Sequence, residues 1–231
     1  MTDDVSIAIE TSCRAGGVAL GCGGELCEAA AFDASREHAT QLVVRLDEML
    51  ARRGLSAGDI RQAYVSAGPG SFTGLRVGIT VVRTLAQAVA GLRCVAVPTA
   101  MAVAENARDL AWENLGVVMD AREDSIYAQL FTRRQGRIVA AAARALSVEE
   151  FLASAPRPLM LMGEGLAYHC LAGPDIVIAD PRLHLPTAEG VWRGGRRLAA
   201  AGEFTEYHRL LPIYTRRPEA VRLWEERHGP G

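Results

Sequence analysis

The sequence contains no lysine, and all 25 of its basic residues are arginine. A P-loop needs a lysine ammonium on the β- and γ-phosphates, and Schiff-base or pyridoxal chemistry needs a lysine amine. The chain by itself is therefore excluded from both enzyme classes. Genomic base composition also produces an arginine bias, and the exclusion holds under either explanation.

Cysteine is scarce and odd in number. Five cysteines occur, without a CxxC motif or a cluster with histidine: Cys13, Cys22, Cys27, Cys94 and Cys170. An odd count argues against a disulfide framework, and the missing ligand spacing argues against a structural zinc site. We expect no metal site and a reducing, cytoplasmic location.

Long apolar runs are also missing. There is no run of about 18 apolar residues and no charged-then-apolar leader, so we expect no membrane span and no signal peptide. The net charge is −2. Such a balance does not attract a phosphate backbone, so we expect any contact with nucleic acid to come through a partner.

Apolar residues make up 49% of the 231 positions, enough for one large domain or two small ones. The first hundred residues predict three strands, a helix, a strand, a helix and a strand, in that order. Their expected ranges are 5–10, 16–20, 25–31, 37–53, 60–66, 73–90 and 94–97. This order is that of one lobe of the actin-like/hexokinase-like ATPase fold.

The second half predicts a reduced version of the same lobe. Strands are expected at 117–120, 125–132, 137–142, 159–162 and 176–178, and helices at 147–153 and 187–201. We therefore expect an α/β protein with two ribonuclease H-like lobes, each a mixed sheet flanked by helices. The expected divisions are residues 1–100, residues 101–211, and a tail at 212–231 that packs back on the first lobe.

A glycine-rich block joins an expected strand to an expected helix. It reads SAGPGSFTGLRVG over residues 66–78. Pro69-Gly70 predicts a tight turn and Ser71 a helix N-cap, and the free amides at such a helix start suit an anion. A capped turn that binds nothing is the alternative.

Polar residues follow the first strand of each expected lobe. In phosphate-binding lobes of this kind an acidic residue there holds a metal, and hydroxyls face the phosphate. The candidate nucleotide-binding residues are Glu10, Thr11, Ser12, Asp120 and Gly163. The alternatives are hydroxyls that satisfy a turn, a local pair between Asp120 and Arg122, and a flexible loop at Gly163.

The helix expected at 73–90 is apolar around most of its circumference. Its polar residues share one narrow stripe: Arg76, Thr80, Arg83, Thr84 and Gln87. A helix resting on one sheet needs an apolar arc of only about 100°. Either this helix is buried on two sides within its lobe, or its outer face meets another subunit. Gly74 and Gly78, about one turn apart, would let a neighbouring helix approach closely.

Catalytic signals are weak. His38 stands near the start of the first helix, and the other histidines are scattered without ligand spacing: His169, His184, His208 and His228. There is no GxSxG elbow. We therefore assign no catalytic residue and no required cofactor.

Five blocks in order resemble the TsaB (YeaZ) family, and together they span nearly the whole chain. They are Ile7–Ser12, Ser35–His38, Gly68–Gly78, Met119–Arg122 and Pro212–Arg216. The glycine-rich block is the most specific of them. The family looks like a degenerate relative of TsaD (Kae1/Gcp type), with the same actin-like fold.

The resemblance implies a role in making threonylcarbamoyladenosine beside the tRNA anticodon. In that system TsaD transfers the threonylcarbamoyl group, TsaB dimerises with it, and TsaE, an ATPase, joins them. Catalytic relatives carry two metal-binding histidines after the strand that follows the glycine-rich helix, and residues 97–106 contain none. Glu10 stands where the family usually has aspartate, which weakens any ATP or ADP site.

The resemblance also implies a docking face on the first two helices, at about 38–53 and 73–90. The residues expected there are Leu42, Leu46, Leu75, Gly78, Ile79, Val82 and Ala86. The same face would serve a homodimer of the isolated chain. Three other functions stay open: a nucleotide-hydrolysing or peptidase-like enzyme of this fold, a small-molecule kinase of this fold, and a direct tRNA binder.

Overall fold

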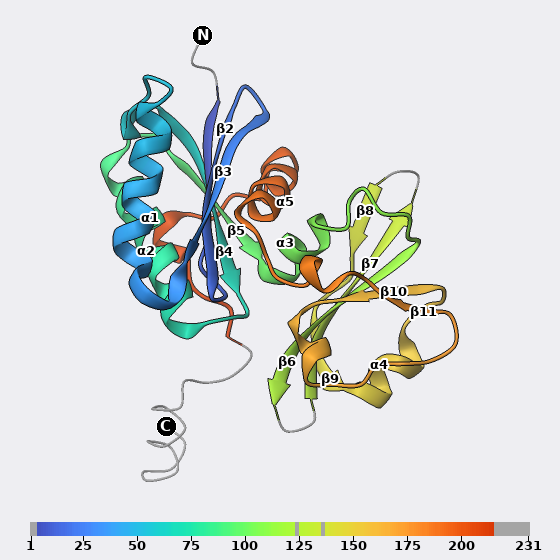
Figure 1. Ribbon diagram of the computed structural model, residues 1–231. Coiled ribbons are helices and arrows are strands. Elements are labelled where there is room, and N and C mark those ends of the chain that lie inside the picture. Colours follow the sequence, from blue (N-terminus) through green and yellow to red (C-terminus); the bar gives the residue numbers. More distant parts are fainter. Residues whose placement is uncertain (1–3, 123–124, 135–136, 215–231) are drawn as a thin grey trace.

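The computed structural model describes residues 4–122, 125–134 and 137–214, and of residues 33–40 and 122 it describes the backbone alone. The chain forms two mixed sheets in two lobes (Figure 1). The expected α/β two-lobe fold is confirmed. Among the described residues, no helix combines the length and the apolar character that crossing a membrane requires.

The first lobe is a five-stranded sheet in the order β3-β2-β1-β4-β5. Its strands are β1 (Val5–Glu10), β2 (Ala15–Cys22), β3 (Glu25–Asp33), β4 (Ile60–Gly68) and β5 (Arg93–Pro98). β2 runs antiparallel to both β1 and β3, whereas β4 and β5 run parallel to β1. Sequence analysis found all five, with ends that differ by a few residues.

The second lobe repeats this topology. Its sheet has the order β11-β10-β6-β7-β8, with β9 paired to β7. The strands are β6 (Asn114–Arg122), β7 (Ser125–Arg134), β8 (Arg137–Ala140), β9 (Arg144–Ser147), β10 (Leu159–Met162) and β11 (Ile176–Ile178). Thus β6 corresponds to β1, and β10 corresponds to β4. The expected reduced copy of the first lobe is confirmed.

Helices cover both faces of the first sheet. α1 (Ala34–Ala51) and α2 (Phe72–Ala88) lie side by side on one face, whereas α3 (Thr99–Glu105) and α5 (Ala188–Ala200) lie between the sheet and the second lobe (Figure 1). α4 (Val148–Ser154) belongs to the second lobe, and short 3-10 turns complete the chain: η1 (Ala57–Asp59), η2 (Glu164–Ala167), η3 (Pro181–Leu183) and η4 (Tyr207–Arg209). Ile7 and Ile9 of β1 face the α1–α2 side, and Ala8 faces the other core.

Helix starts follow the expected capping chemistry. The Ser71 hydroxyl accepts a hydrogen bond from the Gly74 amide at 3.2 Å, and Thr187 caps α5 in the same way. Ser147 and Glu150 form the expected capping box at α4. α1 begins one residue before Ser35, the residue predicted as its cap. Sequence analysis missed α3 and β9, which are only 7 and 4 residues long.

The domain division at residue 101 needs a correction. α5 returns to the first sheet, where an added Cβ at Gly195 would lie 2.3 Å from the Tyr64 ring. The Thr205 amide then donates to the Cys94 carbonyl at 2.8 Å, and the Ile213 amide donates to Ala67 at 2.6 Å. Residues from 188 to 214 therefore complete the first lobe. The predicted return of the tail holds for residues 212–214, and the remainder of the tail lies outside the described residues.

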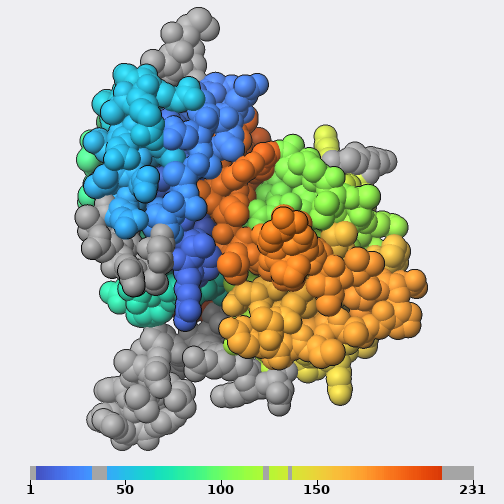
Figure 2. All heavy atoms as spheres, viewed as in Figure 1, coloured from blue at the N-terminus to red at the C-terminus, as the bar shows by residue number. Residues whose placement is uncertain are grey.

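The two lobes share one hydrophobic core. It joins β5 and α3 to Leu115 and Phe131 of the second lobe and to Trp192 of α5. In the space-filling view the orange segment that contains α5 fills the space between the blue first lobe and the green start of the second (Figure 2). The lobes are consequently fixed against each other by packing.

Candidate functional site

The turn after β1 is buried. Glu10 and Thr11 are fully enclosed, and Ser12 is 4% exposed. The Ser12 hydroxyl donates to Glu10 Oε1 at 2.6 Å, the Ser12 amide donates to the same oxygen, and the Thr11 amide donates to Ser66 Oγ at 3.3 Å. Glu10 Oε2 and Thr11 Oγ1 have no hydrogen-bond partner among the described residues.

The glycine-rich block encloses this turn. The Ser71 amide donates to the Ser12 carbonyl at 2.6 Å. An added Cβ at Gly70 would lie 2.4 Å from the Ser12 carbonyl oxygen, and one at Gly74 would lie 1.9 Å from the Thr11 carbonyl oxygen. These glycines therefore let the loop and α2 pack directly on the strand end. Of the two alternatives for this block, the capped turn agrees with this closed geometry.

Burial controls the charge of Glu10. Loss of hydration raises the pKa of this carboxyl to about 7, although hydrogen bonds from Ser12 act in the opposite direction. Burial also raises the pKa of the neighbouring Cys13 thiol to about 12, and the charges of Glu10 and Glu164 add to that effect. Glu164 belongs to the second lobe, so the two strand ends face each other.

The corresponding strand end of the second lobe is also filled. Asp120 Oδ1 lies 3.0 Å from His169 Nε2. The predicted Asp120–Arg122 pair depends on an Arg122 side chain that lies outside the described residues. Gly163 has a φ of +114°, and a Cβ there would lie 2.2 Å from the Val118 carbonyl oxygen.

The five candidate nucleotide-binding residues therefore occupy equivalent strand ends in two facing lobes. However, Gly70 and Gly74 pack on the end of β1, and Gly163 packs on Val118 of β6. Glu10 Oε2 has no partner among the described residues but is fully enclosed, so neither a phosphate nor a metal ion that accompanies it can reach this oxygen in the arrangement described. This closed arrangement does not fit ATP or ADP.

The residues expected in the docking face lie elsewhere than predicted. Six of the seven are buried inside the chain's own first lobe: Leu42, Leu46, Leu75, Gly78, Ile79 and Val82. Ala86 is half-buried. A Cβ at Gly78 would lie 2.4 Å from Thr11 Oγ1, so this glycine admits the end of β1 and not a partner helix. These residues form core, and their assignment to a docking surface is wrong for this structure.

Other residues occupy the outer faces of the same helices. Val43 and Val44 of α1 are about half exposed, as is Phe72 at the start of α2. A groove of about 370 Å³ runs along α2, lined by Thr73, Arg76, Val77, Thr80 and Val81. Sequence analysis missed these residues because it assigned the partner to the most apolar stripe of each helix.

Two aromatic side chains stack beside Arg76, one of the residues that line this groove. Phe72 and Tyr214 stack with ring centroids 5.1 Å apart, and the Arg76 guanidinium lies 5.2 Å from the Phe72 ring centre. Tyr214 reaches Phe72 because the chain from Leu210 onward returns to the first lobe. Cation–aromatic stacking holds the guanidinium beside the apolar groove.

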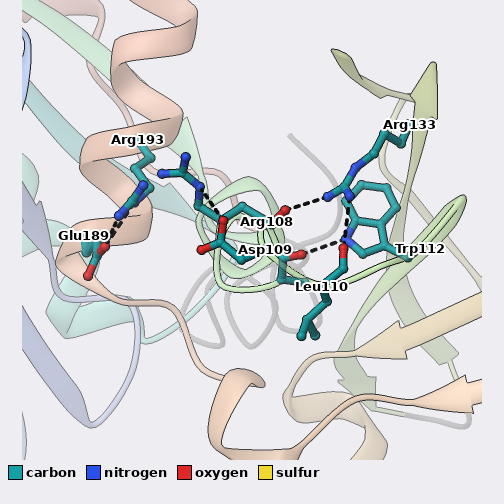
Figure 3. Close-up of polar contacts among 8 residues, drawn as sticks. Arg108, Asp109, Leu110, Trp112, Arg133, Glu189 and Arg193 are labelled. Atoms are coloured by element: carbon teal, nitrogen blue, oxygen red, sulfur yellow. Dashed lines mark hydrogen bonds and ion pairs between the residues drawn. The ribbon is translucent and has the colours of Figure 1, made fainter. Parts of the chain in front are cut away.

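A second hollow, of about 240 Å³, lies where α3, η3 and α5 meet. Its arginines are paired with carboxylates: Arg193 with Glu189, and Arg108 with Asp109 at 3.5 Å (Figure 3). Beside it, the Arg133 guanidinium stacks on the Trp112 ring at 4.2 Å and donates to backbone carbonyls (Figure 3). Arg182, the third arginine that lines the hollow, is paired with Asp180 at 2.6 Å, so each of these positive charges has a carboxylate beside it.

The histidines are held separately. His169 contacts Asp120, His184 contacts the Ala179 carbonyl at 3.0 Å, and His208 contacts Glu206 at 3.2 Å. The side chains of His38 and His228 lie outside the described residues. In the part of the chain that the structure describes, no group of three or more histidine, cysteine, aspartate or glutamate side chains is placed to hold a metal ion.

Comparisons with known proteins agree with this architecture. The family model described as "TsaD: tRNA N6-adenosine threonylcarbamoyltransferase" matches residues 32–178, more than half of the chain. Two solved structures from Pseudomonas aeruginosa are similar to it. One is described as similar to peptidase YEAZ (TM-score 0.79, 28% identity, covering 92% of this chain and 100% of that chain). The other is described as YeaZ (TM-score 0.78, 28% identity, covering 91% and 99%).

Proteins named tRNA threonylcarbamoyladenosine biosynthesis protein TsaB are similar over most of the sequence. The Escherichia coli protein is 28% identical over 232 residues, covering 91% of this chain and 94% of that protein. The Bacillus subtilis protein is 25% identical over 200 residues, covering 83% and 85%. With its two lobes and these matches, the chain belongs to the TsaB (YeaZ) family of tRNA threonylcarbamoyladenosine biosynthesis proteins.

Proposed function

We propose that this chain is a non-catalytic subunit that docks onto a TsaD-type threonylcarbamoyltransferase and holds it in an active arrangement. A TsaE-type ATPase is the third component, and tRNA is reached only through the assembled cytoplasmic complex. One observation carries the proposal: α1 and α2 expose apolar side chains beside an open groove, on the side of the molecule that faces away from the second lobe (Figure 1).

The closed strand ends support the non-catalytic part of the proposal. A phosphate at the β1 end would have to displace the Ser71–Ser12 backbone hydrogen bond and the packing of Gly74 on Thr11. The buried Ser12 carbonyl would then lose its partner, which would cost about 1–3 kcal/mol. The arrangement therefore favours a fold that has kept the lobes and lost the ligand.

The exposed surface of α1 and α2 supports the docking part. Isolated exposed valines are ordinary, but here two adjacent valines of α1 are exposed on a lobe whose α2 also carries an apolar groove. A partner that presents an equivalent pair of helices could fill the groove with its own side chains. A standard interface of about 800 Å² per partner would cover this face. A second copy of this chain would use the same face when no catalytic partner is present.

Charge substitutions on this face test the proposal. We expect Val44→Glu and Val81→Glu to remain folded and to lose most of their affinity for the purified TsaD-type partner of the same organism. An unpaired carboxylate in an apolar interface costs several kcal/mol, which corresponds to more than about 100-fold in the dissociation constant. Binding is measured by isothermal titration calorimetry, with circular dichroism as the check on folding.

Val177→Glu is the matched control. Val177 is 60% exposed on β11 of the second lobe, whereas Val44 is 50% exposed on α1. We expect the control to bind the partner as the unmodified chain does. Equal binding by all three variants would refute the docking face. Nucleotide or peptide hydrolysis by the purified chain alone would favour the enzyme alternatives instead.

A further inference from the structure

Two thiols lie at the tip of the β2–β3 hairpin. The strands are joined by Gly23 and Gly24, whose φ values of +58° and +87° fit the tight turns that connect such strands. Cys22 is the last residue of β2 and pairs with Glu25 at the start of β3. Cys27 lies two residues after Glu25, on β3.

A β-bulge places Cys27 close to the residue that pairs with Cys22. Gly21 pairs with Leu26 and Leu20 pairs with Glu28, so Cys27 is an extra residue that faces no partner in the ladder. Bulges redirect the side chain that they carry. Cys27 Sγ lies 3.8 Å from the carbonyl oxygen of Glu25, the residue that pairs with Cys22. Interaction with the Cys27 thiol also contributes to the raised pKa of Cys22.

The surroundings leave both sulfurs open to reagents. Both cysteines are half-buried, whereas Cys94 is fully enclosed. Arg53 donates to the Cys27 carbonyl at 3.4 Å. Burial and the neighbouring Cys27 raise the pKa of the Cys22 thiol, and the positive charge of Arg53 opposes this rise in part. Burial raises the pKa of Cys94 to about 11, so that thiol is a poor nucleophile.

We propose that Cys22 and Cys27 form a reversible oxidation site, a dithiol that a low-molecular-weight disulfide such as oxidised glutathione converts into an intramolecular disulfide. One protein thiol loses its proton and attacks a sulfur of the small disulfide, which releases one small thiolate. The second protein thiol then attacks the mixed disulfide and releases the other. Two electrons pass from the protein to the small disulfide, and the two protons end on the two small thiols.

The hairpin tip has room for this bond. In a disulfide the two sulfurs lie about 2.05 Å apart, so the ends of β2 and β3 must move to bring the two thiols within bonding distance. Gly23 can absorb the shift, because a Cβ there would meet no atom within 4 Å. Gly21 packs on Trp192 and Gly24 lies against Arg196, so these two glycines are held in place. The movement therefore falls on the other residues of the hairpin tip.

Mass spectrometry of the full chain tests the site in a Cys170→Ser background, which removes the exposed fifth cysteine. After incubation with oxidised glutathione we expect a mass lower by two hydrogen atoms, reversed by reductant. Cleavage after Glu25, between the two cysteines, should leave the fragments linked. Cys27→Ser and Cys22→Ser should each instead retain one glutathione adduct. A stable adduct on the chain with both cysteines, or a bond to Cys13, would overturn the proposal.

Phenylarsine oxide gives an independent measure on the reduced chain, because one arsenical bridges two adjacent thiols. We expect one arsenical per chain, mapped to the fragment that contains Cys22 and Cys27, and its loss in either single serine variant. If a serine variant fails to fold, mapping the bound arsenical on the chain with both cysteines still shows whether Cys22 and Cys27 bind it together. Binding at any other cysteine, or none, would refute the pairing.

Discussion

The Ser71 amide donates to the Ser12 carbonyl oxygen at 2.6 Å, and this bond joins the glycine-rich block to the end of the first strand. It fixes the block against the strand end whose residues were the candidates for nucleotide binding. The consequences of this closure can be measured through the glycines that permit it and through the carboxyl that it buries.

Gly74→Ala should destabilise the protein strongly. The new Cβ would lie 1.9 Å from the Thr11 carbonyl oxygen, and both groups belong to the backbone, so neither can rotate away. Overpacking of this kind costs about 1–3 kcal/mol or more. Urea denaturation followed by circular dichroism measures the loss. Gly58→Ala is the control, since its Cβ would meet only Ser56 Oγ at 3.6 Å, and an equal loss there would contradict this explanation.

Glu10 should make the protein less stable as the pH rises. Its pKa is about 7 in the folded state, against 4.5 as the ordinary value, so folding favours the protonated form. That contribution is fully present below pH 4.5 and is lost as the pH rises through 7, about 3 kcal/mol in all. Glu10→Gln mimics the protonated carboxyl and should remove this dependence. Parallel stability curves for the two proteins between pH 5 and 8 would show that Glu10 does not titrate in this way.

Ile79→Asp should unfold the chain. Ile79 is 3% exposed in the core beneath α2, and a carboxylate there would have no partner among the surrounding apolar side chains. The loss should exceed about 4 kcal/mol, as for other severe core substitutions. Thr80→Asp, one residue along and exposed, should remain folded. Circular dichroism of the two variants separates core from surface, and a folded Ile79→Asp would restore the original docking assignment.

Arg197→Met should lower the free energy of unfolding, because it leaves the buried Glu105 carboxylate without its partner. Arg197 lies 2.7 Å from Glu105, which is 9% exposed, and the Arg197 charge opposes the rise that burial causes in the Glu105 pKa. Removing the partner of such a charge typically costs about 3–5 kcal/mol. We expect the loss to be larger at pH 8 than at pH 5, because Glu105 can take up a proton at the lower pH. Adding Glu105→Gln should recover part of the loss, and additive effects would contradict the coupling.

Most of the fold could be predicted because strands in both lobes are apolar runs bounded by turn residues. β1 and β10 were placed at their observed ends in this way. α3 was missed because a seven-residue helix that is buried on every side has no polar face to reveal its period. The return of α5 to the first sheet leaves no periodic signal, since it depends on contacts between residues far apart in the sequence.

The sequence indicated which residues follow the first strand, and of its two alternatives for the glycine-rich block the capped turn agrees with the structure. Glu10, Ser12 and the glycine block were expected at the strand end, where they lie. Whether glycines admit a phosphate or the chain's own backbone depends on distances of about 2–3 Å, which spacing does not encode. The docking face was assigned to the buried stripe for a related reason. The wide apolar arc of α2 rests on the sheet below and on the η4 segment beside it, with Leu210 fully buried.

The path of α5 has a consequence for the order in which the protein can be assembled. One face of the first sheet is covered by a helix that begins at residue 188, after the whole second lobe. When a ribosome has delivered only the first hundred residues, that face has nothing to cover it. The first lobe to be synthesised is therefore the last to be finished, and a nascent chain released before about residue 188 lacks the helix that covers this face of β1 and β2.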